Sequence, residues 1–231
     1  MKNKVLIIIG CVLAISLFIT HGYADEGGGY YKVTITNITS GQTFTPRIVL
    51  NHKKGVRLFT PGAPASDSLA TLAESGNIEP LSAMMSMNPK VADIAISDGL
   101  LLPGESATVM LDRTGGFGYI SLAAMMIPTN DGFIALNGVK APRGHRSVMY
   151  LSPAYDAGSE LNDEVCDNIP GPFCKGTGPS DENGEGYVHI HAGIHGIADV
   201  PDYDFDWRNP VARVVIERVS HDDDDDNSDD L

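Results

Sequence analysis

Short stretches of alternating apolar and polar residues constrain the fold of this chain most. Tyr31, Val33 and Ile35 alternate with polar neighbours, which is the period of a strand with one buried face. Seven more segments are predicted to be strands: residues 44–50, 105–111, 119–127, 133–136, 147–151, 187–191 and 212–219. Turn residues such as Pro103 and Gly104 separate them. The pattern predicts an all-β protein, an eight-stranded antiparallel β-sandwich.

One segment has helical rather than strand spacing. Apolar residues recur every three to four positions within residues 67–75, at Leu69, Leu72 and Ala73. Asp67 stands in the position of an N-cap, and Gly76 follows where a helix would end. We therefore expect a short helical insertion that packs on the sandwich. The methionines that follow are interpreted as packing residues, because thioether sulfur is too soft for calcium: Met84, Met85 and Met87.

The N-terminus has the pattern of a cleaved signal peptide. Lys2 and Lys4 precede an apolar run over residues 5–20, and Gly22 and Ala24 offer small residues for signal peptidase. A retained membrane anchor is the alternative, but the run is shorter than the roughly 20 residues of a spanning helix. Residues 1–24 are therefore predicted to be removed. This predicts a periplasmic or secreted protein with no stable membrane span after cleavage.

The charge balance of the remaining chain is strongly acidic. Removing residues 1–24 takes away two of the 16 basic side chains and none of the 30 acidic ones, which leaves a formal charge of −16. This charge argues against nucleic acid as a partner. Residues 220–231 contain five consecutive aspartates and are predicted to be a disordered acidic tail. Between the predicted signal peptide and this tail we expect a flexible segment, residues 25–29, and a single domain, residues 30–219.

Two cysteines remain after the predicted cleavage. Cys166 and Cys174 bracket a loop rich in proline and glycine. In an oxidising compartment an even pair of this kind predicts one disulfide. A reactive thiol pair is the alternative, although the spacing is not Cys-x-x-Cys.

Three acidic residues are candidates for binding a cation. Asp131, Asp156 and Glu160 each lie in a loop that follows a predicted strand, so fold closure could bring them to one end of the sandwich. Calcium prefers six to eight oxygen ligands, and carboxylates are among the commonest. The alternative is that these are ordinary polar loop residues, since turns also favour aspartate and glycine.

The histidines provide an alternative chemistry. His189 and His191 would lie on one face of a strand, with His195 a turn later, which is compatible with zinc or copper. They would then form a transition-metal site or a metalloenzyme centre. The alternative is that they orient a loop through hydrogen bonds. Since no hydrolase or nucleotide-binding motif is found in the sequence, we predict that the protein is not an enzyme.

The single tryptophan is followed by an arginine. Trp207 could anchor a partner, but a lone tryptophan more often fills the core edge of a sandwich. Arg208 is predicted to hold the neighbouring acidic loops by bidentate pairing.

Several of these segments, taken together, resemble one known family. The segments are residues 121–133, 155–158, 193–196 and 206–210, and they are similar to the spondin N-terminal domain, specifically to its stand-alone bacterial version. The resemblance spans about residues 30–219. It implies an eight-stranded antiparallel sandwich that resembles membrane-targeting calcium-binding sandwiches, with calcium at one end. In animals the domain belongs to extracellular-matrix proteins engaged in cell adhesion.

The resemblance also assigns the metal site. By position, the acids of the family fall on Asp131, Asp156 and Glu160, the last where many relatives have aspartate. The implied function is a secreted or periplasmic, non-catalytic calcium-binding sandwich that mediates adhesion or envelope interaction. Its implied partners are a calcium ion and an unidentified extracellular or envelope protein or glycan.

Overall fold

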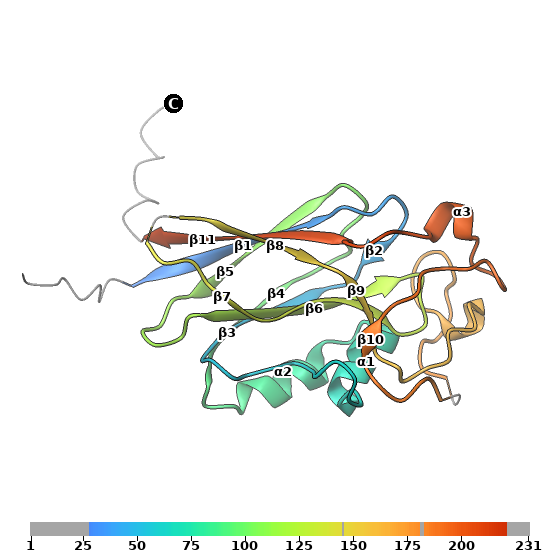
Figure 1. Ribbon diagram of the computed structural model, residues 1–231, viewed down its shortest axis with the longest axis horizontal. Coiled ribbons are helices and arrows are strands. Elements are labelled where there is room, and N and C mark those ends of the chain that lie inside the picture. Colours follow the sequence, from blue (N-terminus) through green and yellow to red (C-terminus); the bar gives the residue numbers. More distant parts are fainter. Residues whose placement is uncertain (1–27, 145, 181–182, 221–231) are drawn as a thin grey trace, which may run out of the picture.

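The computed structural model describes residues 28–144, 146–180 and 183–220 (Figure 1). The predicted signal peptide, residues 1–24, lies outside this range, as do residues 25–27 and the acidic residues 221–231. Within the described part of the chain, no helix is long and apolar enough to cross a membrane.

The first sheet has four antiparallel strands in the order β5-β1-β11-β8. These strands are β5 (Ser106–Asp112), β1 (Gly29–Asn37), β11 (Ala212–Ser220) and β8 (Val148–Ser152). Val33 of β1 is paired with Ile216 of β11 on one side and with Val109 of β5 on the other. Burial alternates along β1, as its sequence pattern predicts, because one face of this sheet covers the core.

The second sheet has seven strands. Six follow the order β10-β9-β7-β6-β3-β4, and β2 pairs with β6 beside this path. In that order they are β10 (His189–Ile190), β9 (Ala154–Asp156), β7 (Gly132–Lys140), β6 (Tyr119–Ile127), β3 (Arg47–His52), β4 (Val91–Ser97) and β2 (Thr43–Phe44). The two antiparallel sheets confirm the prediction of an all-β sandwich.

The core has two parts because both faces of the second sheet are covered. Between the sheets, Val33 and Ile216 belong to the same buried cluster as Val49 and Leu122. On the outer face, Ile48 of β3 packs in a second cluster with residues of α1 (Asp67–Ser75) and α2 (Glu79–Ser86). Figure 1 shows these helices beneath the second sheet. Strand β3 is consequently buried at every residue, which removes the alternation that marks a half-exposed strand.

The predicted helix is confirmed with the expected bounds, but its cap is not Asp67. Ser66 is the N-cap, and its side chain accepts a hydrogen bond from the Leu69 backbone N–H. At the other end Gly76 adopts φ +70° and donates its N–H to the Leu72 carbonyl. Helix α2 was not predicted, although Pro80 occupies its first turn.

The methionine cluster lies in and after α2. Met85 is buried in the second core cluster, and Met84 packs against that cluster. Met87 is 78% exposed. The packing interpretation is therefore correct for the first two methionines and wrong for Met87.

The strand count differs from the eight predicted because proline divides one predicted segment and because two strands were missed. Pro46 separates β2 from β3 within the predicted strand 44–50, since proline has no N–H for a ladder. Strand β9, which was predicted to be a loop, follows Pro153, where the chain passes from one sheet to the other. Strand β4 was missed, and of the predicted strand 187–191 only His189 and Ile190 pair, with β9.

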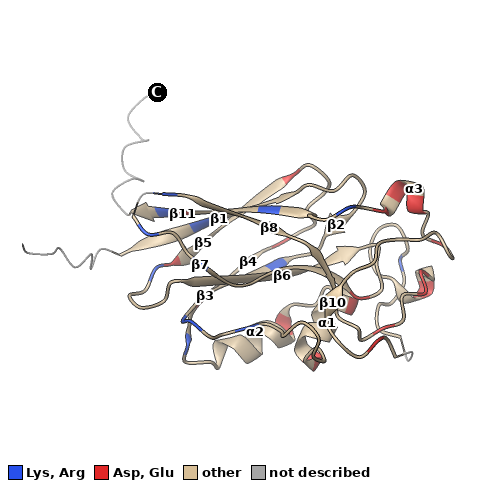
Figure 2. Ribbon diagram, viewed as in Figure 1, with Lys and Arg blue, Asp and Glu red and all other residues tan. Residues whose placement is uncertain are grey.

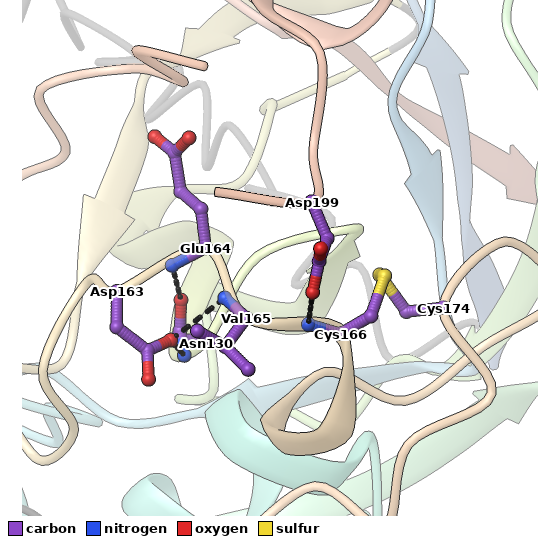
Figure 3. The surroundings of a disulfide bond; sticks show 7 residues. All are labelled: Asn130, Asp163, Glu164, Val165, Cys166, Cys174 and Asp199. Atoms are coloured by element: carbon purple, nitrogen blue, oxygen red, sulfur yellow. Dashed lines mark hydrogen bonds between the residues drawn. A yellow bond between two sulfur atoms is a disulfide. The ribbon is translucent and has the colours of Figure 1, made fainter. Parts of the chain in front are cut away.

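The long segment between β9 and β11 is folded through side-chain hydrogen bonds. It contains the short helices η1 (Cys166–Asn168) and α3 (Asp202–Phe205) as well as β10. The predicted disulfide between Cys166 and Cys174 is confirmed (Figure 3). The Cys166 N–H donates to Asp199 Oδ2 at 3.0 Å, and Asp163 Oδ1 accepts from Asn130 Nδ2 at 2.8 Å (Figure 3). The Asn130–Asp163 bond ties the segment just before the disulfide to the turn that carries Asp131, and the Cys166–Asp199 bond ties Cys166 to the segment after β10.

Candidate metal centre

The fold brings Asp131 and Asp156 to the same end of the sandwich. Asp131 lies in the turn between β6 and β7, and Asp156 is the last residue of β9. Strands β7 and β9 pair with Gly132 opposite Asp156, and the Ala157 N–H donates to the Asp131 carbonyl at 3.2 Å. The side chains of Asp131 and Asp156 are both buried.

The Asp131 carboxylate has one satisfied and one unsatisfied oxygen. Its Oδ2 accepts from the backbone N–H groups of Ser159 at 2.8 Å and Glu160 at 3.1 Å. Its Oδ1 is buried and has no hydrogen-bond partner among the described residues. Burial, together with the negative charge of Asp156, raises the pKa of Asp131 to about 7. Because this oxygen lacks a positive partner, the ionised form of the Asp131 carboxyl is costly to bury.

Asp156 is more fully hydrogen-bonded. Its Oδ1 accepts from the Gly158 N–H at 2.7 Å, and its Oδ2 accepts from Asn162 Nδ2 at 2.7 Å. Burial raises the pKa of this carboxyl, whereas the Asn162 hydrogen bond and the nearby His189 oppose the rise. Asp156 therefore adds negative charge beside Asp131 without supplying it a hydrogen-bond donor.

Glu160 donates its backbone N–H to Asp131, and its carboxylate lies close enough to repel the Asp131 carboxylate. Its Oε1 accepts a hydrogen bond from the Ser180 N–H, whereas its Oε2 is buried without a partner in the part of the chain that the structure describes. Burial raises the pKa of Glu160 to about 7, with repulsion from Glu74 and Asp163 acting in the same direction. The two buried oxygens without a partner, Asp131 Oδ1 and Glu160 Oε2, therefore belong to two of the three predicted ligands.

The three histidines face two different acids. His189 Nδ1 lies 3.6 Å from Asp156 Oδ1, and His191 Nε2 lies 4.0 Å from Asp156 Oδ2. His195 is exposed, and its Nδ1 lies 3.7 Å from Glu164 Oε1. The geometry therefore distributes the histidines between separate acidic groups rather than around one ion.

His191 is buried and neutral. Its Nδ1 accepts from the Gly193 N–H at 3.0 Å, so the neutral ring carries its proton on Nε2, toward Asp156. Burial, together with the nearby His189 and His195, lowers the pKa of His191 to about 3. Its Nε2 has no hydrogen-bond partner among the described residues and lies 4.0 Å from Asp156 Oδ2. With Nδ1 accepting from Gly193 and Nε2 protonated, this tautomer has no free lone pair for a metal.

A different set of potential ligands is already gathered. Among the described residues, the ligand atoms of Asp156, Glu185 and His189 all lie within 4.8 Å of one another. Glu185 was not predicted, because a single acid between two glycines has no periodic or motif signal. Its position depends on the β9–β10 pairing, which places His189 opposite Asp156.

Glu164 is a second acid that was not predicted, because no motif or spacing marks it. It is buried, and its two carboxylate oxygens accept from the backbone N–H groups of His195 at 2.6 Å and Ile197 at 2.9 Å. These bonds fix the loop that follows β10, which is a structural role.

Trp207 and Arg208 differ in how well they match their predictions. Trp207 is 8% exposed, belongs to the core cluster and packs on His191 with ring centroids 5.0 Å apart, which confirms its role at the core edge. The prediction for Arg208 is wrong. Its side chain is exposed and pairs with Asp206, two residues earlier, and with the Trp207 carbonyl. The acidic loops are held by backbone N–H groups instead.

Two packed antiparallel sheets, with buried carboxylates at one end, define an all-β sandwich. The chain belongs to the spondin N-terminal domain family, because the family model Spondin_N matches residues 35–159. The match includes Asp131 and Asp156 and ends one residue before Glu160. A search of curated proteins found no match. Membership of this family indicates an extracellular, adhesion-type domain.

Proposed function

We propose that this protein is a secreted or periplasmic, non-catalytic calcium-binding domain that mediates adhesion or envelope interaction. The observation that carries the proposal is the buried Asp131 Oδ1, which has no partner and lies in a carboxylate repelled by Asp156. A divalent cation would supply the missing positive charge. Asp131, Asp156 and Glu160 are the residues that would hold it.

The donor set favours calcium over softer metals. Carboxylate and backbone oxygens are hard ligands, and calcium tolerates irregular coordination by six to eight of them. The buried Glu160 Oε2 is a further oxygen without a partner at this end of the sandwich. An ion held between these loops would join the turn before β7 to the segment after β9. Its role would be to rigidify a loop surface that meets an extracellular or envelope protein or glycan.

Thermal unfolding of chelator-treated protein without a His tag tests this proposal. We expect calcium to raise the melting temperature, because an ion that binds only the folded state stabilises it by an amount that grows with the logarithm of its concentration over its dissociation constant. Asp131→Asn and Asp156→Asn should each abolish the increase. Asp204→Asn is the matched control, because Asp204 is exposed on α3. Equal melting temperatures in calcium and chelator would refute the proposal.

A second candidate function is transition-metal binding at Asp156, Glu185 and His189. The observation that favours it is the proximity of their ligand atoms, within 4.8 Å. One imidazole and two carboxylates suit zinc. Of the three predicted histidines, His189 belongs to this set. Metal analysis distinguishes the candidates: stoichiometric zinc that is lost in His189→Ala supports this site, whereas calcium that His189→Ala retains supports the first proposal.

A further inference from the structure

A cavity lies at the end of the sandwich opposite the acidic loops. Strands β6 and β7 connect the two ends: Asp131 lies between the end of β6 and the start of β7, whereas the cavity lies where β6 begins and β7 ends. It has a volume of about 300 Å³ and is formed by residues 113–119 and 140–143, with Tyr31 of β1. This volume is at the lower limit of small-ligand sites, about 300 Å³.

The cavity gathers positive charge in a strongly acidic protein. Arg113, Lys140 and Arg143 line it, and within the described part of the chain no acidic residue does. The whole chain has a formal charge of −14. Figure 2 shows lysines and arginines concentrated toward this end, and most acidic residues toward α3 and β10. Because the neighbouring positive charges repel one another, an anionic ligand that neutralises them is favoured.

Aromatic rings stand beside these cations. Phe117 and Tyr119 line the cavity, and Lys53 Nζ lies 4.7 Å from the centre of the Phe117 ring. Both aromatic side chains are partly exposed. An aromatic surface adds contact with the apolar face of a ligand ring, which a simple inorganic anion does not have.

The glycines of the loop leave its backbone accessible. Gly116 has φ +83°, which its turn requires. Gly115 and Gly118 do not have the positive φ of the left-handed region, and a Cβ at either would meet no atom within 4 Å. Neither packing nor left-handed geometry therefore explains glycine at these two positions, whereas close approach of a ligand to the backbone would.

We propose that this cavity binds an acidic saccharide. Arg113, Lys140 and Arg143 would pair with its sulfate or carboxylate groups, and Phe117 and Tyr119 would pack on the sugar ring. The site shares no residue with the acidic loops. The proposal therefore does not depend on calcium binding, although it names a ligand class for an extracellular adhesion-type domain.

Calorimetric titration of the full mature chain tests the proposal with four probes. They are a uronic-acid disaccharide carrying one sulfate, its desulfated and carboxyl-reduced counterpart, inorganic sulfate, and vesicles of phosphatidylcholine with phosphatidylglycerol. We expect binding of the sulfated disaccharide, weakened by salt because Lys140 and Arg143 are exposed. Lys140→Gln combined with Arg143→Gln should lower its affinity about tenfold, an effect of about 1.4 kcal/mol. Arg213→Gln, which removes an exposed cation on β11, should have no effect.

Gly115→Ala gives a test that does not change charge. The added methyl points into open space, so the fold should be unaffected while the affinity for the disaccharide falls. Equal affinity for the uncharged disaccharide, or for inorganic sulfate, would overturn the proposal. So would binding to the vesicles without binding to the disaccharide, or no binding at all. Circular dichroism and melting temperatures of each variant show that the fold is retained.

Discussion

Asp131→Asn is expected to stabilise the ion-free protein at neutral pH. The asparagine amide oxygen can accept the N–H groups of Ser159 and Glu160, as Asp131 Oδ2 does. Its amide nitrogen would occupy the position of the unsatisfied Oδ1. The substitution therefore keeps the hydrogen bonds of the loop and removes a buried negative charge.

The magnitude follows from the raised pKa of Asp131. The folded-state pKa is about 7, compared with 3.8 for an ordinary aspartate. Between these values the folded carboxyl keeps a proton that the unfolded chain has released. The free energy of unfolding therefore falls as the pH rises from about 4 to about 7, and is constant above that. At about 1.4 kcal/mol for each pH unit between the two pKa values, the loss reaches about 4 kcal/mol.

Thermal unfolding in chelator and in calcium tests this reasoning. In chelator at pH 7.5, Asp131→Asn should melt above the wild type, by at most about 8 to 16 °C for a domain of this size. At pH 4 the two proteins should melt together, because the wild-type carboxyl is then protonated. In calcium at pH 7.5 only the wild type should gain stability. A variant that melts below the wild type in chelator, or one that still responds to calcium, would refute the reasoning.

Three further predictions concern the same end of the molecule. In chelator, the free energy of unfolding of Glu160→Gln should fall less between about pH 4.5 and pH 7 than that of the wild type, because burial raises the pKa of Glu160 to about 7. An unchanged pH profile of urea unfolding would contradict this. Replacing Cys166 and Cys174 with serine should lower the free energy of unfolding by about 2.5 kcal/mol, the chain-entropy effect of a cross-link spanning eight residues; urea unfolding with no loss would show that the loop is held by its hydrogen bonds alone. Gly158→Ala should cost at least about 1 kcal/mol, because φ is +65° and the new Cβ would collide with the Tyr187 backbone. Gly55→Ala is the control, because Gly55 has φ +94° but a Cβ there would meet no atom within 4 Å. An equal loss of stability in both variants would show that the collision does not contribute.

The sandwich was predictable because burial alternates where a strand covers the core on one side. Residues of β1 and β11 show this alternation, and the helix of residues 67–75 has its apolar residues on one side. Strand β4 and helix α2 were missed. In β4 most residues are only partly buried, and α2 has few turns in which a period can be recognised.

The candidate site was predictable only in part. The positions of Asp131 and Asp156 after strands indicated a shared end, and the β7–β9 pairing brings them together. The direction of the Glu160 carboxylate, toward Ser180, depends on a loop 20 residues later in the chain. Glu185 likewise reaches Asp156 through the pairing of β10. Such contacts are determined by tertiary folding and leave no local pattern in the sequence.

Anomalous diffraction from crystals grown in calcium is the most direct test of the central claim. The account predicts one peak at bonding distance from Asp131 Oδ1, with Asp156 and the Glu160 carboxylate among the ligands. It also predicts that Asp131→Asn crystals lack the peak. Wild-type crystals with no peak between these loops, and with Asp131 Oδ1 contacting only protein or water, would contradict the account.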